Sequence, residues 1–178
     1  MDIGSDNGRQ WFEALCERTD HHLWRSYRHD VNPANLENGT AVLFPRSKGR
    51  VVRVSEQEAR FAFAIELAKD NQPRPFVPED PTKLKYRFCR RGTGANGTSA
   101  QTDLAIYDRD GERGLRNMEF KSGGYSPSRK NKEDIRKDCV KLLCEPRDGA
   151  WFHVFEKVDN RTITGMLKVL AKALREFQ

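Results

Sequence analysis

Residues 102–121, TDLAIYDRDGERGLRNMEFK, decide the expected fold of this 178-residue chain. Polar and apolar side chains alternate along residues 102–107 and again along residues 115–121, as they do in strands with one buried face. Between these segments, residues 108–114 carry Asp and Gly in the pattern of a turn. The stretch therefore predicts two antiparallel strands joined as a hairpin.

The hairpin is expected to gather charged side chains on one face. Centred on Gly111, it sets Asp103 opposite Glu119, because each lies eight residues from that glycine. Directly opposed residues share a face, with Cβ atoms about 5 Å apart. Lys121 lies two residues beyond Glu119 and points to the same side. The other face is predicted to supply core side chains, namely Leu104, Ile106, Met118 and Phe120.

The grouping of Asp103, Glu119 and Lys121 suits the binding of a divalent cation. Two carboxylates held close together repel each other unless a cation or a proton lies between them. Mg²⁺ prefers carboxylate oxygens, and a bound Mg²⁺ polarises a phosphoryl oxygen and activates a water. A neighbouring ammonium stabilises the negative charge that develops. The alternative is a strand whose polar face is simply exposed to water.

Patterns elsewhere in the chain predict the elements around the hairpin. Ser55 and Glu58 fit a capping box, and the four prolines within residues 71–81 predict a loop. In the last helix, the residues predicted to face inward are Leu167, Leu170, Ala171 and Leu174, and those predicted to face outward are Lys168, Lys172 and Arg175. The expected order is helix 8–29, strand 41–44, helix 51–69, strand 83–89, the hairpin, helix 132–144, strand 150–157 and a helix from residue 162. This order predicts a mixed α/β fold, a mixed sheet flanked by helices.

Composition narrows the class of protein. A mass of 20.5 kDa fits a single domain over residues 1–178, and no apolar run approaches the roughly 18 residues of a membrane span. The net charge of +6 favours a polyanionic partner such as nucleic acid, and the lack of a long apolar run predicts no membrane partner. The four cysteines lack zinc-site spacing, and no secretory signal is visible, so a cytoplasmic location is expected.

Basic residues cluster in two stretches that are candidates for phosphate binding. The first is interleaved with Tyr86 and Phe88 and comprises Lys83, Lys85, Arg87, Arg90 and Arg91. The second follows the hairpin and comprises Arg129, Lys130 and Lys132. The alternative for the first stretch is a strand face that only meets solvent.

The order of these motifs resembles the PD-(D/E)XK nuclease superfamily. That pattern is a helix with a Glu, a strand with an Asp, a strand with Glu-x-Lys and a second helix. Glu58, Asp103, Glu119-Phe-Lys121 and the helix around residues 134–141 match it in order. One departure is Thr102, which stands where the pattern has Pro. The resemblance covers residues 51–157 and implies a restriction-endonuclease-like core with an extra N-terminal helical segment in residues 1–50 and a C-terminal helix.

The resemblance also implies an activity, metal-dependent hydrolysis of phosphodiester bonds. Asp103, Glu119 and Glu58 would be metal ligands, and Lys121 would orient or activate the water. The implied cofactor is Mg²⁺, with Mn²⁺ as a substitute. The alternative for Glu58 is that capping its own helix explains it fully.

The preferred interpretation is a DNA endonuclease of restriction, defence, repair or junction processing. Cutting both strands of a duplex requires two sites, which favours a homodimer, and helices 8–29 and 162–177 are the candidate interface. The alternative is a catalytically inactive nucleic-acid-binding or protein-interaction module on the same fold.

Overall fold

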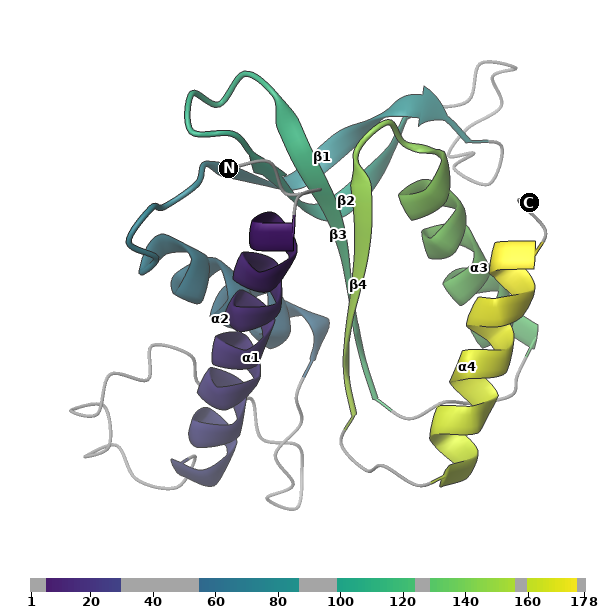
Figure 1. Cartoon of the computed structure of the whole chain (residues 1–178). Helices are drawn as coiled ribbons and strands as arrows, with labels where there is room; N and C mark the ends of the chain where they lie inside the picture. The colour runs from purple at the N-terminus through teal and green to yellow at the C-terminus, as the bar shows by residue number, and fades with distance from the viewer. Residues whose placement is uncertain (1–5, 30–54, 87–98, 124–128, 156–159, 176–178) are drawn as a thin grey trace.

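The computed structural model describes residues 6–29, 55–86, 99–123, 129–155 and 160–175, which form four helices and four strands (Figure 1). The strand predicted at residues 41–44 lies outside this part of the chain. None of the described helices is long and apolar enough to cross a membrane. In chain order the elements are α1 (Asp6–His29), α2 (Glu56–Ala68), β1 (Phe76–Lys85), β2 (Ser99–Tyr107), β3 (Gly114–Ser122), α3 (Arg129–Cys144), β4 (Asp148–Val154) and α4 (Asn160–Arg175).

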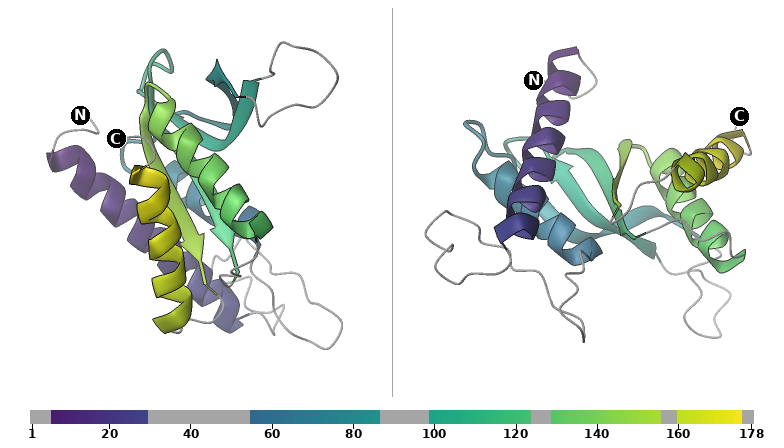
Figure 2. Two further views of the ribbon diagram at one scale, coloured as in Figure 1. Left: turned by 90° about the vertical axis from the view of Figure 1, so that its right-hand side faces the viewer. Right: turned by 90° about the horizontal axis from the view of Figure 1, so that it is seen from below.

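The strands form one mixed sheet in the order β1-β2-β3-β4. β1 and β2 pair antiparallel, β2 and β3 pair antiparallel, and β3 and β4 pair parallel. Helices α1 and α2 cover one face of the sheet, and α3 and α4 lie on the opposite side (Figures 1 and 2). The prediction of a mixed sheet flanked by helices is confirmed.

From Leu104 to Ile106 the hairpin has the register that the sequence predicts, but the ladder stops there and does not include the expected pair of Asp103 and Glu119. Leu104 pairs with Met118 and Ala105 pairs with Asn117, which centres the two strands on Gly111. Gly111 has a φ of 74°, in the left-handed region that glycine adopts without strain. The Asp108 carboxylate accepts hydrogen bonds from two backbone N–H groups of the turn and so fixes its shape.

The main core lies between the hairpin and helices α1 and α2. The four apolar hairpin residues predicted to be buried have no solvent exposure, which confirms which face they share. Phe63 of α2 packs edge-on against Phe120, with ring centroids 5.5 Å apart. The remaining buried side chains of this core come from both helices and are Leu15, Leu23, Ala59, Ala62 and Leu67.

Helix α2 begins at Glu56, later than the predicted residue 51 and directly after the predicted cap residue Ser55. The Ser55 side chain accepts from the backbone N–H of Gln57, and the Glu58 carboxylate accepts from the backbone N–H of Ser55 at 2.7 Å. These contacts satisfy N–H groups that a helix start leaves without partners, so the capping box is confirmed.

The predicted loop at residues 71–81 is wrong from Phe76 onward, because β1 includes Pro78 and Pro81. Among the described strands, β1 lies at the edge of the sheet and pairs only with β2. Proline lacks the N–H that a central strand needs on both sides, but an edge strand has one side free of pairing. The prolines of residues 71–81 would not fit a central strand, but they are compatible with an edge strand such as β1.

Helix α4 packs differently from its predicted orientation. Val169 and Leu170 pack against Ile135 and Cys139 of α3. Leu167 is 56% exposed, and Ala171 is exposed too, so the prediction that they face inward is wrong. α4 lies on α3 and not directly on the sheet, which leaves it a narrower buried stripe than a core helix has. The outward positions of Lys168, Lys172 and Arg175 are confirmed.

Candidate active site

The site begins where strands β2 and β3 stop pairing with each other. Their ladder ends at Leu104 and Met118, although both strands continue. Beyond that point β2 pairs only with β1, through Thr102 and Gln101, while β3 pairs only with β4, through residues 119–122. We call this divergence, between residues 101–103 and residues 119–121, the strand fork.

Asp103 lies at the point where the strands diverge. Its Oδ2 accepts a hydrogen bond of 2.7 Å from the backbone N–H of Phe120. The side chain thus takes the place of the carbonyl that would continue the ladder. Arg60 of α2 approaches the backbone carbonyl of the same residue at 3.5 Å. The carboxylate of Asp103 also lies close enough to Glu119 to raise the pKa of that side chain.

Glu119 is a buried acid, with a side chain that is 1% exposed. Burial raises its pKa above the ordinary value of 4.5, and repulsion from Asp138 and Asp103 adds to the rise against the attraction of Lys141. Its Oε1 lies 2.6 Å from Lys141 Nζ but makes no well-directed hydrogen bond with any residue that the structure describes. Oε1 is therefore a buried acceptor whose hydrogen-bonding capacity is only partly used.

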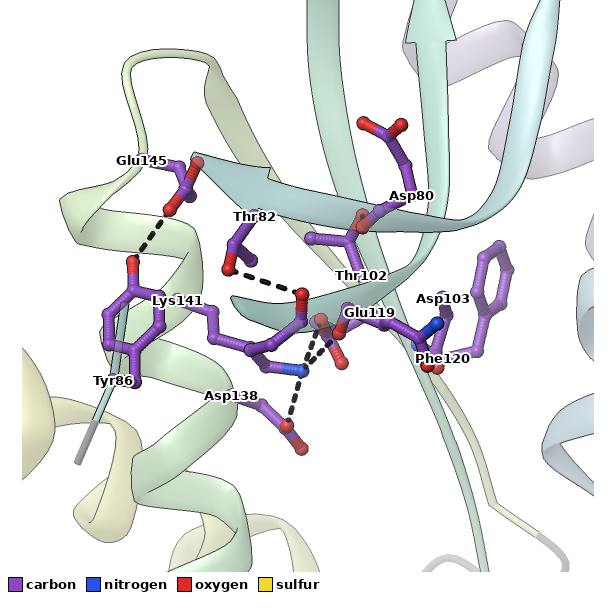
Figure 3. Close-up of polar contacts among 12 residues, drawn as sticks. Asp80, Thr82, Tyr86, Thr102, Asp103, Glu119, Phe120, Asp138, Lys141 and Glu145 are labelled. Atoms are coloured by element: carbon purple, nitrogen blue, oxygen red, sulfur yellow. Dashed lines mark hydrogen bonds and ion pairs between the residues drawn. The ribbon is translucent and has the colours of Figure 1, made fainter. Parts of the chain in front are cut away.

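Lys141 spans the strand fork from helix α3 (Figure 3). Its Nζ meets three oxygens from three elements: Glu119 Oε1 of β3 at 2.6 Å, Asp138 Oδ1 of α3 at 3.1 Å and the Gln101 carbonyl of β2 at 3.0 Å. The ammonium thus lies among the kind of hard oxygen donors that also bind Mg²⁺. The pKa of Lys141 is raised because Glu119 and Asp138 outweigh the effect of burial.

Lys121 lies beside this group with different partners. Its Nζ is 3.1 Å from Asp138 Oδ2 and 3.7 Å from Glu56 Oε2. Burial lowers the pKa of Lys121, but Asp138 and Glu56 raise it by more, so the side chain is held as an ammonium. The structure therefore brings Asp103, Glu119 and Lys121 to one place and adds Asp138 and Lys141.

The acid that α2 contributes is Glu56 and not Glu58. The hydrogen bonds of Glu58 go to the backbone and side chain of Ser55, as the capping alternative predicted. Glu56 lies two positions earlier and reaches Lys121. Its pKa is raised by burial and by Asp103 and Asp138, against the attraction of Lys121. The capping box could have identified Glu56 from the sequence, because the box uses the Glu58 carboxylate to cap the helix and leaves Glu56 to face the site.

Sequence reasoning also missed Asp138 and Lys141. Both flank the apolar stripe of α3, and both are at most 8% exposed. They lie three positions apart, the spacing that brings two side chains together on a helix. An opposite-charge pair beside a buried stripe was a signal in the sequence, but nothing in it indicated that the pair meets Glu119.

The two predicted basic stretches are only partly described. Lys83 and Lys85 are exposed on β1, whereas Arg87, Arg90 and Arg91 lie outside the described residues. Arg129, Lys130 and Lys132 belong to the start of α3, with side chains outside the described part.

The end of β1 that carries the lysines is held by Glu145. Its carboxylate accepts from the backbone N–H groups of Lys83 and Leu84 and from the Tyr86 hydroxyl, at 2.9, 3.1 and 2.9 Å (Figure 3). Leu84 is 45% exposed, and the strand register shifts between Pro81 and Lys85.

The donors at the strand fork fit a divalent cation in type. Asp103 and Glu119 offer carboxylate oxygens, and Glu119 Oε1 is a buried acceptor without a well-directed hydrogen bond. Across the described ranges, no three acidic, His or Cys side chains converge as a ready metal site. Because Lys141 already contacts Glu119, a metal ion at that oxygen would have to displace an ammonium.

Comparison of the chain with protein-family models, with curated proteins and with solved structures gives no match.

Proposed function

We propose that this protein is a Mg²⁺-dependent nuclease that hydrolyses phosphodiester bonds in nucleic acid, with DNA as the expected substrate. The observation that carries the proposal is the strand fork, where Asp103 and Glu119 lie with the ammonium groups of Lys121 and Lys141. The order α2-β1-β2-β3-α3-β4 supports the finer proposal of a restriction-endonuclease-like core, with the Asp on β2 and Glu-x-Lys on β3.

Each residue has a proposed role that follows from its surroundings. Asp103 and Glu119 would hold the metal ion, which supplies a polarised phosphoryl oxygen and an activated water when bound. Lys121 would stabilise negative charge and would not accept a proton, because the neighbouring acids raise its pKa. The net charge of +6 would draw a polyanionic substrate to the surface.

Plasmid nicking tests the proposal. We expect the wild-type protein to nick supercoiled plasmid in Mg²⁺ and not in EDTA, and Glu119→Ala to nick no faster than the EDTA control. Glu112→Ala, in the exposed hairpin turn, is the matched control and should retain wild-type nicking. Equal nicking by the wild-type protein and Glu119→Ala would reject the proposal.

Metal binding has a separate readout. Anything that binds only the folded state raises the melting temperature. We expect Mg²⁺ to raise the melting temperature of the wild-type protein and to have a smaller effect on Glu119→Ala. A homodimer and a cytoplasmic location remain predictions, and sedimentation analysis tests the former.

One observation favours a second candidate, a nucleic-acid-binding module without catalysis. Lys141 already neutralises Glu119, so the pair is electrostatically compensated without a metal ion. Salt-dependent DNA binding, together with no Mg²⁺-dependent cleavage, would support this candidate.

A further inference from the structure

A single carboxylate on helix α3 contacts both lysines of the site. Asp138 Oδ2 lies 3.1 Å from Lys121 Nζ, and its Oδ1 lies 3.1 Å from Lys141 Nζ. Asp138 is only 8% exposed, so these contacts form with little competition from water. One side chain therefore sets the separation between the two ammonium groups (Figure 3 shows the contact with Lys141).

The two lysines depend on Asp138 to different degrees. Lys141 has two further oxygen partners, Glu119 and the Gln101 carbonyl. Lys121 has only one further ion-pair partner among the described residues, Glu56, at the longer distance of 3.7 Å. The Glu56 side chain is 46% exposed, so that contact is weakened by solvent. Removal of Asp138 should release Lys121 more than Lys141.

Asp138 also has an effect that does not serve stability. A third acid beside Glu119 and Asp103 adds repulsion to a buried site. Packing alone gives no reason for a carboxylate at this position, whereas the placement of two ammonium groups does.

We propose that Asp138 is a positioning residue of the site, which holds Lys121 toward the strand fork and directs Lys141 onto Glu119. The inference rests on the proposed nuclease function for its catalytic consequence, and on the ion pairs alone for its geometric content. Asp138 itself is not assigned contact with substrate.

Three variants of α3 test the catalytic consequence. Asp138→Asn keeps the shape and removes the charge, and Asp138→Glu restores the charge. The matched control is Asp134→Asn, because Asp134 forms an ion pair with Lys137 at the same spacing on the same helix, at 3.5 Å and more exposed. Cleavage is measured at a temperature where every variant is folded, so that lost stability does not lower the rate.

We expect Asp138→Asn to lower kcat by about 10- to 100-fold, the usual effect of losing a residue that orients a functional group, with KM changed by less than about threefold. Asp138→Glu should recover most of the loss, and Asp134→Asn should cleave as the wild-type protein does. Wild-type kcat in Asp138→Asn would overturn the inference. If Asp138→Asn does not fold, Lys121→Met removes the other end of the ion pair and must lower kcat instead; an unchanged kcat would overturn the inference.

A metal-free measurement separates this inference from the proposed function. Urea unfolding without Mg²⁺ is measured for Asp138→Asn, Lys121→Met and the double variant, and likewise for Asp134→Asn with Lys137→Met. The Asp138–Lys121 cycle should show clear coupling, and the exposed Asp134–Lys137 cycle should show little. Additive effects in the first cycle would overturn the inference even if the protein cleaves DNA. Coupling without any cleavage by the wild-type protein would reject the nuclease proposal and support the geometric content of the inference.

Discussion

The middle of strand β3 is buried on both faces, and the two faces differ in chemistry. Toward α1 and α2, Met118 and Phe120 have no solvent exposure. Toward α3, Asn117 and Glu119 are 2% and 1% exposed. Burial of apolar area stabilises the fold, whereas burial of charge contributes little net stability even when the charge is paired. The first face therefore accounts for folding, and the second is where function is expected.

The charged face itself divides into two regions. Near the hairpin turn, Arg147 donates to Asp80, Asn117 and Tyr107, and the Tyr107 hydroxyl donates to Asp80. Every side chain of that network has a hydrogen-bond partner, as a structural network requires. At the strand fork, in contrast, Glu119 keeps a buried oxygen without a well-directed hydrogen bond. The two clusters therefore differ in how fully their buried polar atoms are paired, and the proposed function depends on the less fully paired cluster.

The largest effect on stability should come from the apolar face. Phe63 is fully buried and contacts three other aromatic rings, and its replacement by Ala should lower the free energy of unfolding by about 3–5 kcal/mol. Phe61, on the same helix and 56% exposed, is the matched control, and its replacement by Ala should change that free energy by less than about 0.5 kcal/mol. Urea unfolding measures both, and similar losses would contradict the assignment of the core.

The charged face should give a smaller effect that depends on pH. Lys141→Met leaves Glu119 buried without its ion pair and should cost about 1–3 kcal/mol at pH 8. Loss of the lysine raises the pKa of Glu119 further, so the folded state keeps that proton to higher pH than the unfolded state does. The free energy of unfolding then falls as pH rises above 4.5, and the cost should be smaller at pH 5.

Lys137→Met is the control for that measurement, since Lys137 pairs with the exposed Asp134 on the same helix. It should change the free energy of unfolding by less than about 0.5 kcal/mol at either pH. A cost for Lys141→Met that is the same at pH 5 and pH 8 would contradict the account of Glu119.

The smallest effect should come from His153 of β4, which pairs with Lys121 in the sheet. Burial, with the charge of Lys121 as a further cause, lowers the pKa of His153 below 6.5 despite its hydrogen bond with the Gly123 carbonyl. Below pH 6.5 the unfolded chain takes up a proton that the folded protein does not, so stability is lost as pH falls. His153→Gln should reduce the loss between pH 7 and pH 5 that urea unfolding detects, with the exposed His21→Gln as the control for removing a histidine. An unchanged dependence on pH would show that His153 does not contribute.

Local patterns predicted much of this fold. Alternation along two strands and a glycine at the turn predicted the hairpin register and its apolar face, which residues 104 and 118 confirm. The capping box predicted the start of α2. The shared face of Asp103 and Glu119 was predicted from that register, and that of Lys121 from its place two residues after Glu119. This part of the candidate site therefore needed no information from distant segments. These features depend on neighbours within a few residues or across one tight turn, and a sequence displays such relations directly.

Only the tertiary structure decided which groups complete the site. The parting of β2 from β3 depends on β1 and β4 pairing with the two strands separately. Whether Glu56 or Glu58 faces Lys121, and whether Lys141 reaches Glu119, depends on how two helices pack against a sheet. Helical spacing indicates which side chains share a helix face, but it does not say what that face meets. The sequence by itself determined the hairpin that carries Asp103 and Glu119. Packing determined which cations surround these acids, because contacts between distant segments produce no periodic pattern in a sequence.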